Sequence, residues 1–198
     1  MVVRLAVVIP VKSFTVAKGR LADVLSPADR EVLARQCADT VVKAAAPARA
    51  YVVCNDESIA EWARAAGATV VGQTTPGLNG AVRDGWDAAV SDGADHIVIA
   101  HADLPLAASF AHVPRGGSVS IVPDRHRDGT NVMSLPAAAQ FDLHYGPGSF
   151  AAHAAEAQRR GLGFVVVEDG DLALDLDTAD DLDELQRRRN DTMKETAR

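Results

Sequence analysis

The chain has 198 residues, 47% of them hydrophobic and 24% charged, which is the size and composition of one globular domain. Its 20 basic and 27 acidic side chains give a net charge of −7, which argues against a protein that coats nucleic acid, because such proteins bind phosphates through Lys and Arg. No apolar run reaches membrane-spanning length and no signal sequence is recognisable, so we expect a cytoplasmic protein without a membrane partner. One domain is predicted over residues 1–190, with a polar tail over 191–198 that frays.

Strand-like and helix-like segments alternate along the chain. An apolar, β-branched run over residues 2–9 ends at Pro10 and predicts a buried strand. Further strands are predicted over residues 50–54, 69–71, 96–100, 118–122, 131–135 and 163–167. Helices are predicted over residues 27–46, 58–66, 80–91 and 149–160 and from about residue 178 onward, with N-terminal caps at Ser26, Ser149 and Thr178. The alternation predicts an α/β fold with a mostly parallel sheet covered on both faces.

The chain contains two cysteines, Cys37 and Cys54. They are too few to form a zinc site by themselves, and a disulfide framework is not expected. Because Cys37 falls in a predicted helix and Cys54 in a predicted strand, we expect both to be small, buried, apolar side chains.

The loop after the first strand is basic. Ligands of such sheets bind beyond the carboxyl ends of the strands, which directs attention to the loops after residues 9, 100 and 122. In the first of them, Lys12, Lys18 and Arg20 could grip a polyphosphate, since Lys supplies a point charge and Arg a fork for two oxygens. A solvated basic loop is the alternative. The loop has neither the dinucleotide fingerprint nor a P-loop, which disfavours a Rossmann dehydrogenase or a P-loop NTPase.

Two groups of acidic side chains could hold Mg²⁺. Asp103 follows the fourth predicted strand, where a carboxylate can hold the ion, although an Asp before Leu-Pro is often a turn residue. Asp175 and Asp177 are two residues apart and share one face of an extended segment, with helix capping as the alternative for Asp177. His101 is expected to be a structural histidine rather than a ligand contact. The remaining acids are expected at the helix start and on its solvent face: Asp180, Asp181, Asp183 and Glu184.

A third region combines glycines with a helix start. Residues 124–131 join cations to a Gly-Thr turn, and residues 145–150 lead into the helix at Ser149. A glycine-lined helix N-terminus with a hydroxyl cap is suited to an anion, and an ordinary capped helix is the alternative.

Taken in order, these segments resemble the deazaflavin-cofactor guanylyltransferases, that is, the 2-phospho-L-lactate / phosphoenolpyruvate guanylyltransferase family. The blocks that carry the resemblance are Pro-Val-Lys at 10–12, Ala-Lys-Gly-Arg-Leu at 17–21, Leu-Ser-Pro at 25–27, Ala-Asp-Leu-Pro at 102–105, Pro-Asp-Arg at 123–125, Gly-Thr-Asn at 129–131 and Tyr-Gly-Pro-Gly-Ser-Phe at 145–150. Asp-Leu-Asp-Thr at 175–178 is similar to the closing block of the wider nucleotidyltransferase superfamily. The resemblance covers about residues 5–186.

The resemblance implies a three-layer α/β/α sandwich of the nucleotide-diphospho-sugar transferase type. It also implies transfer of GMP from GTP to the phosphate of phosphoenolpyruvate, 2-phospho-L-lactate or 3-phosphoglycerate, with release of pyrophosphate, in coenzyme F-420 biosynthesis. The attacking phosphate oxygen is already anionic at neutral pH, so no Ser, Cys or His nucleophile is required. The protein then has to position two anions and cancel charge with cations and Mg²⁺.

Site residues follow from the same resemblance. The triphosphate is expected on the loop formed by Pro10, Val11, Lys12, Lys18 and Arg20. Mg²⁺ is expected on Asp103 and Asp177, the acceptor's phosphate or carboxylate on Thr130, Gly146 and Ser149, and guanine near Asn79 and Gly80 in the loop before the third helix. Two positions depart from the family: Tyr145 replaces a frequent Phe, and His101 leaves the choice of acceptor open.

Three other readings stay open. A molybdopterin or sugar-phosphate nucleotidyltransferase of the same fold usually begins with an Ala-Gly-Gly loop, where this chain has Pro-Val-Lys at 10–12. A glycosyltransferase would explain the spacing of Asp175 and Asp177, but the pair lies near the end of the chain. A non-catalytic nucleotide-binding module would need the basic loop but no metal. The sequence does not decide between a monomer and a homodimer.

Overall fold

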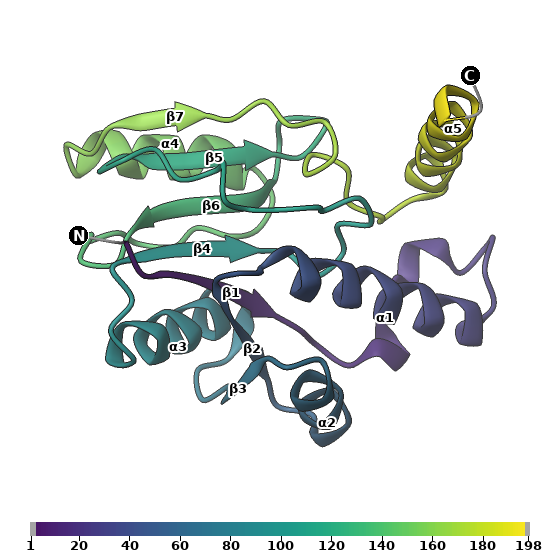
Figure 1. The fold of residues 1–198 in the computed structure, drawn as a ribbon, viewed down its shortest axis with the longest axis horizontal. Helices are drawn as coiled ribbons and strands as arrows, with labels where there is room; N and C mark the ends of the chain where they lie inside the picture. Colours follow the sequence, from purple (N-terminus) through teal and green to yellow (C-terminus); the bar gives the residue numbers. More distant parts are fainter. Residues whose placement is uncertain (1–2, 197–198) are drawn as a thin grey trace.

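Seven strands form one sheet in the computed structural model, which describes residues 3–196 (Figure 1). The strands are β1 (Leu5–Pro10), β2 (Arg49–Cys54), β3 (Thr69–Gly72), β4 (His96–Ala100), β5 (Val119–Pro123), β6 (Thr130–Pro136) and β7 (Phe164–Val166). The α-helices of this part of the chain are α1 (Pro27–Ala44), α2 (Glu57–Ala65), α3 (Gly77–Ser91), α4 (Ser149–Arg159) and α5 (Ala179–Thr196). Two short 3-10 helices, η1 (Phe14–Val16) and η2 (Gly19–Leu21), follow β1.

The strand order is β3-β2-β1-β4-β6-β5-β7. Strand β6 runs antiparallel to β4 and β5, and the other neighbouring pairs are parallel. The predicted mostly parallel sheet is therefore confirmed. From β1 the chain first builds outward through β2 and β3 and then crosses back to add β4 on the other side. In open α/β sheets, the crevice beyond such a reversal is where ligands bind.

Side chains of β1 alternate between two cores, one on each face of the sheet. Val7 and Ile9 belong to a cluster with α1 and α2, whereas Ala6 and Val8 belong to a cluster with α3 and α4. Helix α3 lies close to the sheet at Gly85, where an added Cβ would stand 2.5 Å from a methyl carbon of Val8. The chain is thus a three-layer α/β/α sandwich, as predicted.

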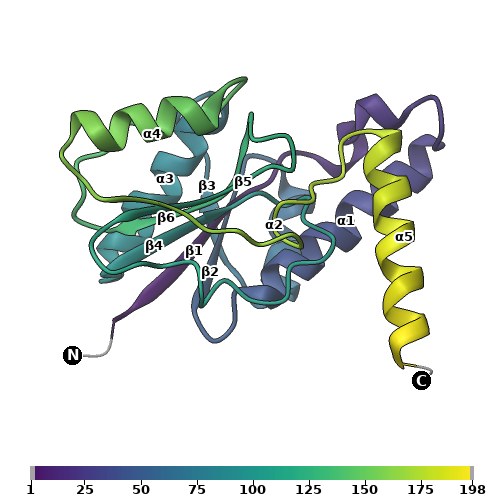
Figure 2. The same ribbon diagram turned by 90° about the horizontal axis from the view of Figure 1, so that it is seen from above.

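Helix α5 lies beside α1 at one end of the molecule rather than on the sheet (Figure 2). A third apolar cluster joins Leu182 and Leu185 of α5 to Leu33 and Cys37 of α1. The helix continues to Thr196, through the polar segment that the sequence predicts to fray. Within the described part of the chain, no helix combines the length and the apolar character needed to cross a membrane.

Both cysteines are free and buried, as expected. Ser26 caps α1 as predicted, because its hydroxyl accepts a hydrogen bond from the amide of Asp29 at 3.2 Å. The first strand begins at Leu5 rather than at Val2, which lies outside the described residues. Leu5 is paired with His96, the first residue of β4, so the ladder has no earlier partner.

Two helix starts differ from the prediction. Helix α3 begins at Gly77, three residues before the predicted start, so Asn79 and Gly80 lie inside the helix and not in a loop. Helix α4 has Gly148 as its N-cap, with φ 71°, and Ser149 makes no capping hydrogen bond. The predicted Ser149 cap is therefore wrong. The amide of Gly148 instead donates to a carboxylate oxygen of Asp128 at 3.2 Å.

Candidate active site

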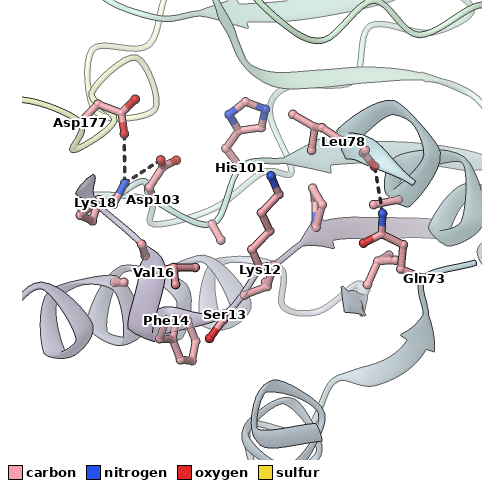
Figure 3. A pocket seen from close by; sticks show the side chains of 18 residues that line it. Lys12, Ser13, Phe14, Val16, Lys18, Gln73, Leu78, His101, Asp103 and Asp177 are labelled. Carbon is pink, nitrogen blue, oxygen red and sulfur yellow. Dashed lines mark hydrogen bonds and ion pairs between the residues drawn. The ribbon is translucent and has the colours of Figure 1, made fainter. Parts of the chain in front are cut away.

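A cavity of about 420 Å³ lies at the carboxyl-terminal edge of the sheet, between the loops that follow β1 and β4 (Figure 3). This is the point where the strand order reverses, as the fold predicts for a ligand site. The lining residues are Pro10, Val11, Lys12, Ser13, Phe14, Val16, Ala17, Lys18, Ala34, Val53, Gln73, Gly77, Leu78, Ala81, His101, Ala102, Asp103 and Asp177.

The cations in the loop after β1 differ in their exposure and in their partners. Phe14 fixes the loop, because its buried ring packs edge-on against Trp62 with the ring centroids 5.1 Å apart. Lys12 is exposed, makes no hydrogen bond or ion pair within residues 3–196, and ends below the His101 ring (Figure 3). Arg20 lies at the margin with 76% of its side chain exposed. Lys12 is therefore the lining cation that has no acidic partner among the described residues.

Lys18 lies on acidic side chains. Its left-handed backbone, with φ 59°, turns the chain back toward the sheet. The ammonium nitrogen is 2.7 Å from a carboxylate oxygen of Asp103 and 3.4 Å from one of Asp177, and the Lys18 side chain is only 6% exposed. Burial alone would lower the pKa of Lys18, but the two carboxylates raise it above its usual value. The lysine is charged and neutralises part of this acidic group.

Three carboxylates surround this position. One oxygen each of Asp103, Asp175 and Asp177 lies within 4.8 Å of the others. Burial and the charge of Asp103 raise the pKa of Asp175 to about 6. The Asp103 pKa is lowered, because Lys18 and His101 outweigh the effect of burial.

The acidic group fits a hard divalent cation. Carboxylate oxygens are the ligands such ions prefer. The second oxygen of Asp103 is buried and has no hydrogen-bond partner among the described residues. An unpaired buried carboxylate oxygen is costly, which indicates a position made for a cation in addition to Lys18. The structure thus joins Asp175 to the two acids that the resemblance selects.

Side chains outside the cavity hold the acidic group. The side-chain nitrogen of Asn131 donates to a carboxylate oxygen of Asp175 at 3.2 Å and to the carbonyl of Leu172 at 3.1 Å. Asp181 accepts hydrogen bonds from the backbone amides of Asp177 at 3.0 Å and Thr178 at 2.7 Å. Asp181 is only 5% exposed, so its predicted place on the solvent face is wrong. It faces inward because it closes the turn that presents Asp177.

Gln73 is a lining residue that the sequence patterns did not reveal. Its amide nitrogen donates to the carbonyls of Thr75 at 2.8 Å and Gly77 at 3.0 Å. The two acceptors fix the orientation of the side-chain amide and leave its oxygen on the cavity side (Figure 3). Its only signal in the sequence is its place directly after β3, at the same sheet edge as the other loops.

Asn79 and Gly80 lie beside this end of the cavity but do not line it. The Asn79 side chain makes two hydrogen bonds with the backbone of Tyr145. It donates to the Tyr145 carbonyl at 3.2 Å and accepts from the Tyr145 amide at 2.8 Å. Gly80 lies under the carbonyl oxygen of Thr75, 2.5 Å from where a Cβ would stand, so only glycine allows this approach. These two residues shape the loop before α3.

The structure places Thr130, Gly146 and Ser149 outside the residues that line the cavity. Thr130 is buried, with its hydroxyl 3.1 Å from Nδ1 of His153 in α4. Ser149 is also buried, and its amide donates to the carbonyl of Gly146 at 3.1 Å. Thr130, Gly146 and Ser149 therefore lie near Tyr145 and not in the cavity. The Tyr145 ring centroid is 4.9 Å from that of His153.

His153 connects α4 to the segment that carries Tyr145. It is fully buried, and its Nε2 accepts a hydrogen bond from the amide of His144 at 2.9 Å. The proton of the neutral ring therefore lies on Nδ1, which donates to Thr130. Burial, followed by the charges of His144 and His101, lowers the pKa of His153 to about 4.

This buried histidine predicts a pH-dependent stability. The unfolded chain binds a proton below pH ~6.5, whereas folded His153 stays neutral down to about pH 4, so stability falls as the pH drops through this window. Between pH 7 and pH 5, we expect the wild type to lose about 2 kcal/mol more unfolding free energy than His153→Gln. Urea unfolding at both pH values measures this difference. The exposed control His126→Gln should behave like the wild type, and equal losses in all three proteins would contradict the prediction.

Solved structures with a similar architecture include nucleotidyltransferases. A putative nucleotide-diphospho-sugar transferase from Desulfovibrio desulfuricans G20 matches with a TM-score of 0.73 at 16% identity, over 94% of this chain and 88% of that chain. A nucleotidyl transferase from Methanothermobacter thermautotrophicus matches with a TM-score of 0.64 at 15% identity, over 95% of this chain and 98% of that chain. The fold is that of a nucleotide-diphospho-sugar transferase.

The sequence places the chain more narrowly. It belongs to the guanylyl transferase CofC-like family, whose profile matches residues 5–196. It is 38% identical to the phosphoenolpyruvate guanylyltransferase of Sphaerobacter thermophilus, over 90% of each chain. It is 34% identical to the 2-phospho-L-lactate guanylyltransferase of Methanothermobacter thermautotrophicus, over 90% of this chain and 82% of the relative. The chain is thus a member of a family of nucleotidyltransferases.

Proposed function

We propose that the protein transfers GMP from GTP to the phosphate of a small phospho-acid. An oxygen of the acceptor phosphate attacks the α-phosphorus of GTP, the bond to the β-phosphate breaks, and pyrophosphate leaves. The acceptors to consider are phosphoenolpyruvate, 2-phospho-L-lactate and 3-phosphoglycerate, and the product would serve coenzyme F-420 biosynthesis. The observation that carries the proposal is that Lys12 lines the same cavity as Asp103 and Asp177 of the acidic group, at the strand-order reversal, in a chain related to guanylyltransferases.

The chain's own residues suit this reaction. Lys12 is free to bind phosphate oxygens, and the exposed Arg20, whose guanidinium lies 3.7 Å from a carboxylate oxygen of Asp177, can add a second cation. Lys18 holds Asp103 and Asp177 in place and keeps a positive charge at the position where phosphates would meet the acids. Asp103, Asp175 and Asp177 would hold Mg²⁺, which supplies charge neutralisation at the α-phosphate. Positioning and charge compensation account for most of the catalysis of such transfers.

Gln73 is suited to read the base. Guanine presents N–H donors on its Watson–Crick edge, and the Gln73 oxygen is an acceptor held in a fixed orientation. Adenine has an acceptor at N1, where guanine has a donor. A fixed carbonyl oxygen at this place therefore favours GTP over ATP.

We expect Gln73→Leu to lower the kcat/KM preference for GTP over ATP about tenfold, because one hydrogen bond to the base is lost. Initial rates of pyrophosphate release with each nucleotide measure this preference. Gln36→Leu, at an exposed position of α1, is the matched control and should keep the wild-type preference. A Gln73→Leu protein that slows equally with both nucleotides would show that Gln73 only shapes the loop.

The proposed function is tested by a pyrophosphate-release screen. GTP, ATP and CTP are each combined with the three phospho-acids, with and without Mg²⁺. The expected result is release that requires GTP, one of the acids and Mg²⁺ together. Turnover without any phospho-acid, or a clear preference for CTP or ATP, would contradict the assignment.

A further inference from the structure

Several buried polar side-chain atoms have no hydrogen-bond partner among the described residues. Among the described residues, five side-chain atoms are buried and unpartnered: Arg30 Nε, His101 Nε2, Asp103 Oδ1, Ser120 Oγ and the Tyr145 hydroxyl. Asp103 Oδ1 belongs to the acidic group already described. His101 and Tyr145 lie next to each other, with ring centroids 5.3 Å apart and the planes tilted by 43°. Such orphaned groups in a folded protein need a partner from a ligand or water.

Both rings are held firmly in this position. His101 is the first residue after β4, and its amide donates to the carbonyl of Asn131 at 3.0 Å. Tyr145 is 8% exposed, and its backbone is held on both sides by the Asn79 side chain. The two side chains make no hydrogen bond with each other, although the rings are in contact distance. Two neighbouring rings in fixed positions therefore each carry a buried polar atom without a hydrogen-bond partner among the described residues.

The His101 and Tyr145 side chains lie between the nucleotide cavity and the predicted acceptor residues. His101 lines the cavity above Lys12 (Figure 3). Tyr145 directly precedes Gly146, and the backbone partner of His101 directly follows Thr130. A molecule whose phosphate meets the nucleotide in the cavity would thus extend toward this pair.

The pair is suited to a neutral group rather than to an anion. A tyrosine hydroxyl both donates and accepts a hydrogen bond, and an imidazole nitrogen does one or the other according to its tautomer. Burial raises the pKa of Tyr145, so its hydroxyl keeps its proton. A ligand hydroxyl likewise donates and accepts, so it can satisfy both groups at once. Carboxylate and phosphate oxygens only accept, and among the described residues that line the cavity Lys12 is the cation without an acidic partner.

We propose that His101 and Tyr145 are the specificity-determining pair of the acceptor site and select a phospho-acid that carries a free hydroxyl group. The inference rests on the proposed function and names the acceptor class within it. An acceptor without that hydroxyl leaves two buried polar groups unpaired, and sites of this kind discriminate strongly against such analogues.

The test compares two acceptors in pyrophosphate release with GTP. 3-Phosphoglycerate carries the hydroxyl, and phosphoenolpyruvate has none. We expect the wild type to have the higher kcat/KM with 3-phosphoglycerate, and Tyr145→Phe to lower the ratio of the two kcat/KM values about tenfold. His101→Leu is the second variant and should shift the ratio in the same direction.

Tyr51→Phe is the matched control. It removes the chain's other tyrosine hydroxyl, which donates to Asp92 at 2.9 Å away from the cavity, and should keep the wild-type ratio. Two results would overturn the role of His101 and Tyr145 in acceptor choice but not the proposed function. One is a wild type that favours phosphoenolpyruvate. The other is a ratio of kcat/KM values that Tyr145→Phe and His101→Leu leave unchanged while GTP turnover persists. A folded wild type that releases no pyrophosphate with either acid or with 2-phospho-L-lactate would overturn both.

Discussion

Asp103→Asn is expected to lower kcat about thousandfold while the protein stays folded. The carboxylate joins the acidic group to Lys18 at 2.7 Å, and its other oxygen is buried without a partner. Replacing it with a neutral amide removes one charge from the proposed cation site and reverses the hydrogen-bonding character of one atom. Charge neutralisation by a bound metal ion contributes several kcal/mol to such reactions, which corresponds to a loss of this size.

The measurement is steady-state pyrophosphate release at saturating GTP, phospho-acid and Mg²⁺. Asp95→Asn is the matched control, because Asp95 directly precedes β4, binds Arg4 and lies at the opposite edge of the sheet from Asp103. It should retain turnover close to that of the wild type. An Asp103→Asn protein with near-normal kcat would remove the acidic group from the proposed mechanism.

Lys18→Met is expected to destabilise the metal-free protein by about 2 kcal/mol, because it leaves partly buried carboxylates without their cation. Since the same carboxylates would hold Mg²⁺, the ion should recover most of this loss. Urea unfolding in chelator and in excess Mg²⁺ measures both effects.

Lys43→Met, which removes an exposed lysine in the last turn of α1, is the control and should change the unfolding free energy by less than about 0.5 kcal/mol. If Lys18→Met loses the same stability with and without Mg²⁺, the acidic group does not bind the ion. Such a result would leave Lys18 as a purely structural ion-pair partner.

The fold was largely predictable from local patterns. Apolar runs bounded by turn residues identified the strands, and the Ser26 cap with Pro27 marked the start of α1 to the residue. The errors lie where a neighbour in space decides the boundary. Helix α3 begins early because Asp84 binds the amides of Thr74 and Thr75 and shortens the preceding loop.

The candidate site was predictable only in part. Lys12 and Asp103 were selected because they follow buried strands, and both line the cavity. The inward turn of Asp181 and the orientation of Gln73 were not predicted. Their hydrogen bonds are local, since Asp181 binds the amides of Asp177 and Thr178 and Gln73 binds the carbonyls of Thr75 and Gly77, but only the fold places these turns beside the cavity.

The distribution of charged residues along the chain also separates what is predictable from the sequence from what depends on the fold. The order of residues is enough to show that cations gather near the start of the chain and acids near its end, and that an α/β sheet would bring strand ends to one edge. Which of these charges form ion pairs depends on the folded arrangement. Lys18 and Asp177 are 159 positions apart and yet form an ion pair, whereas Lys12 faces the cavity unpaired by any described residue. Pairing over such separations depends on how the layers pack, because side-chain partners in space are chosen by the whole fold and not by neighbours in the chain.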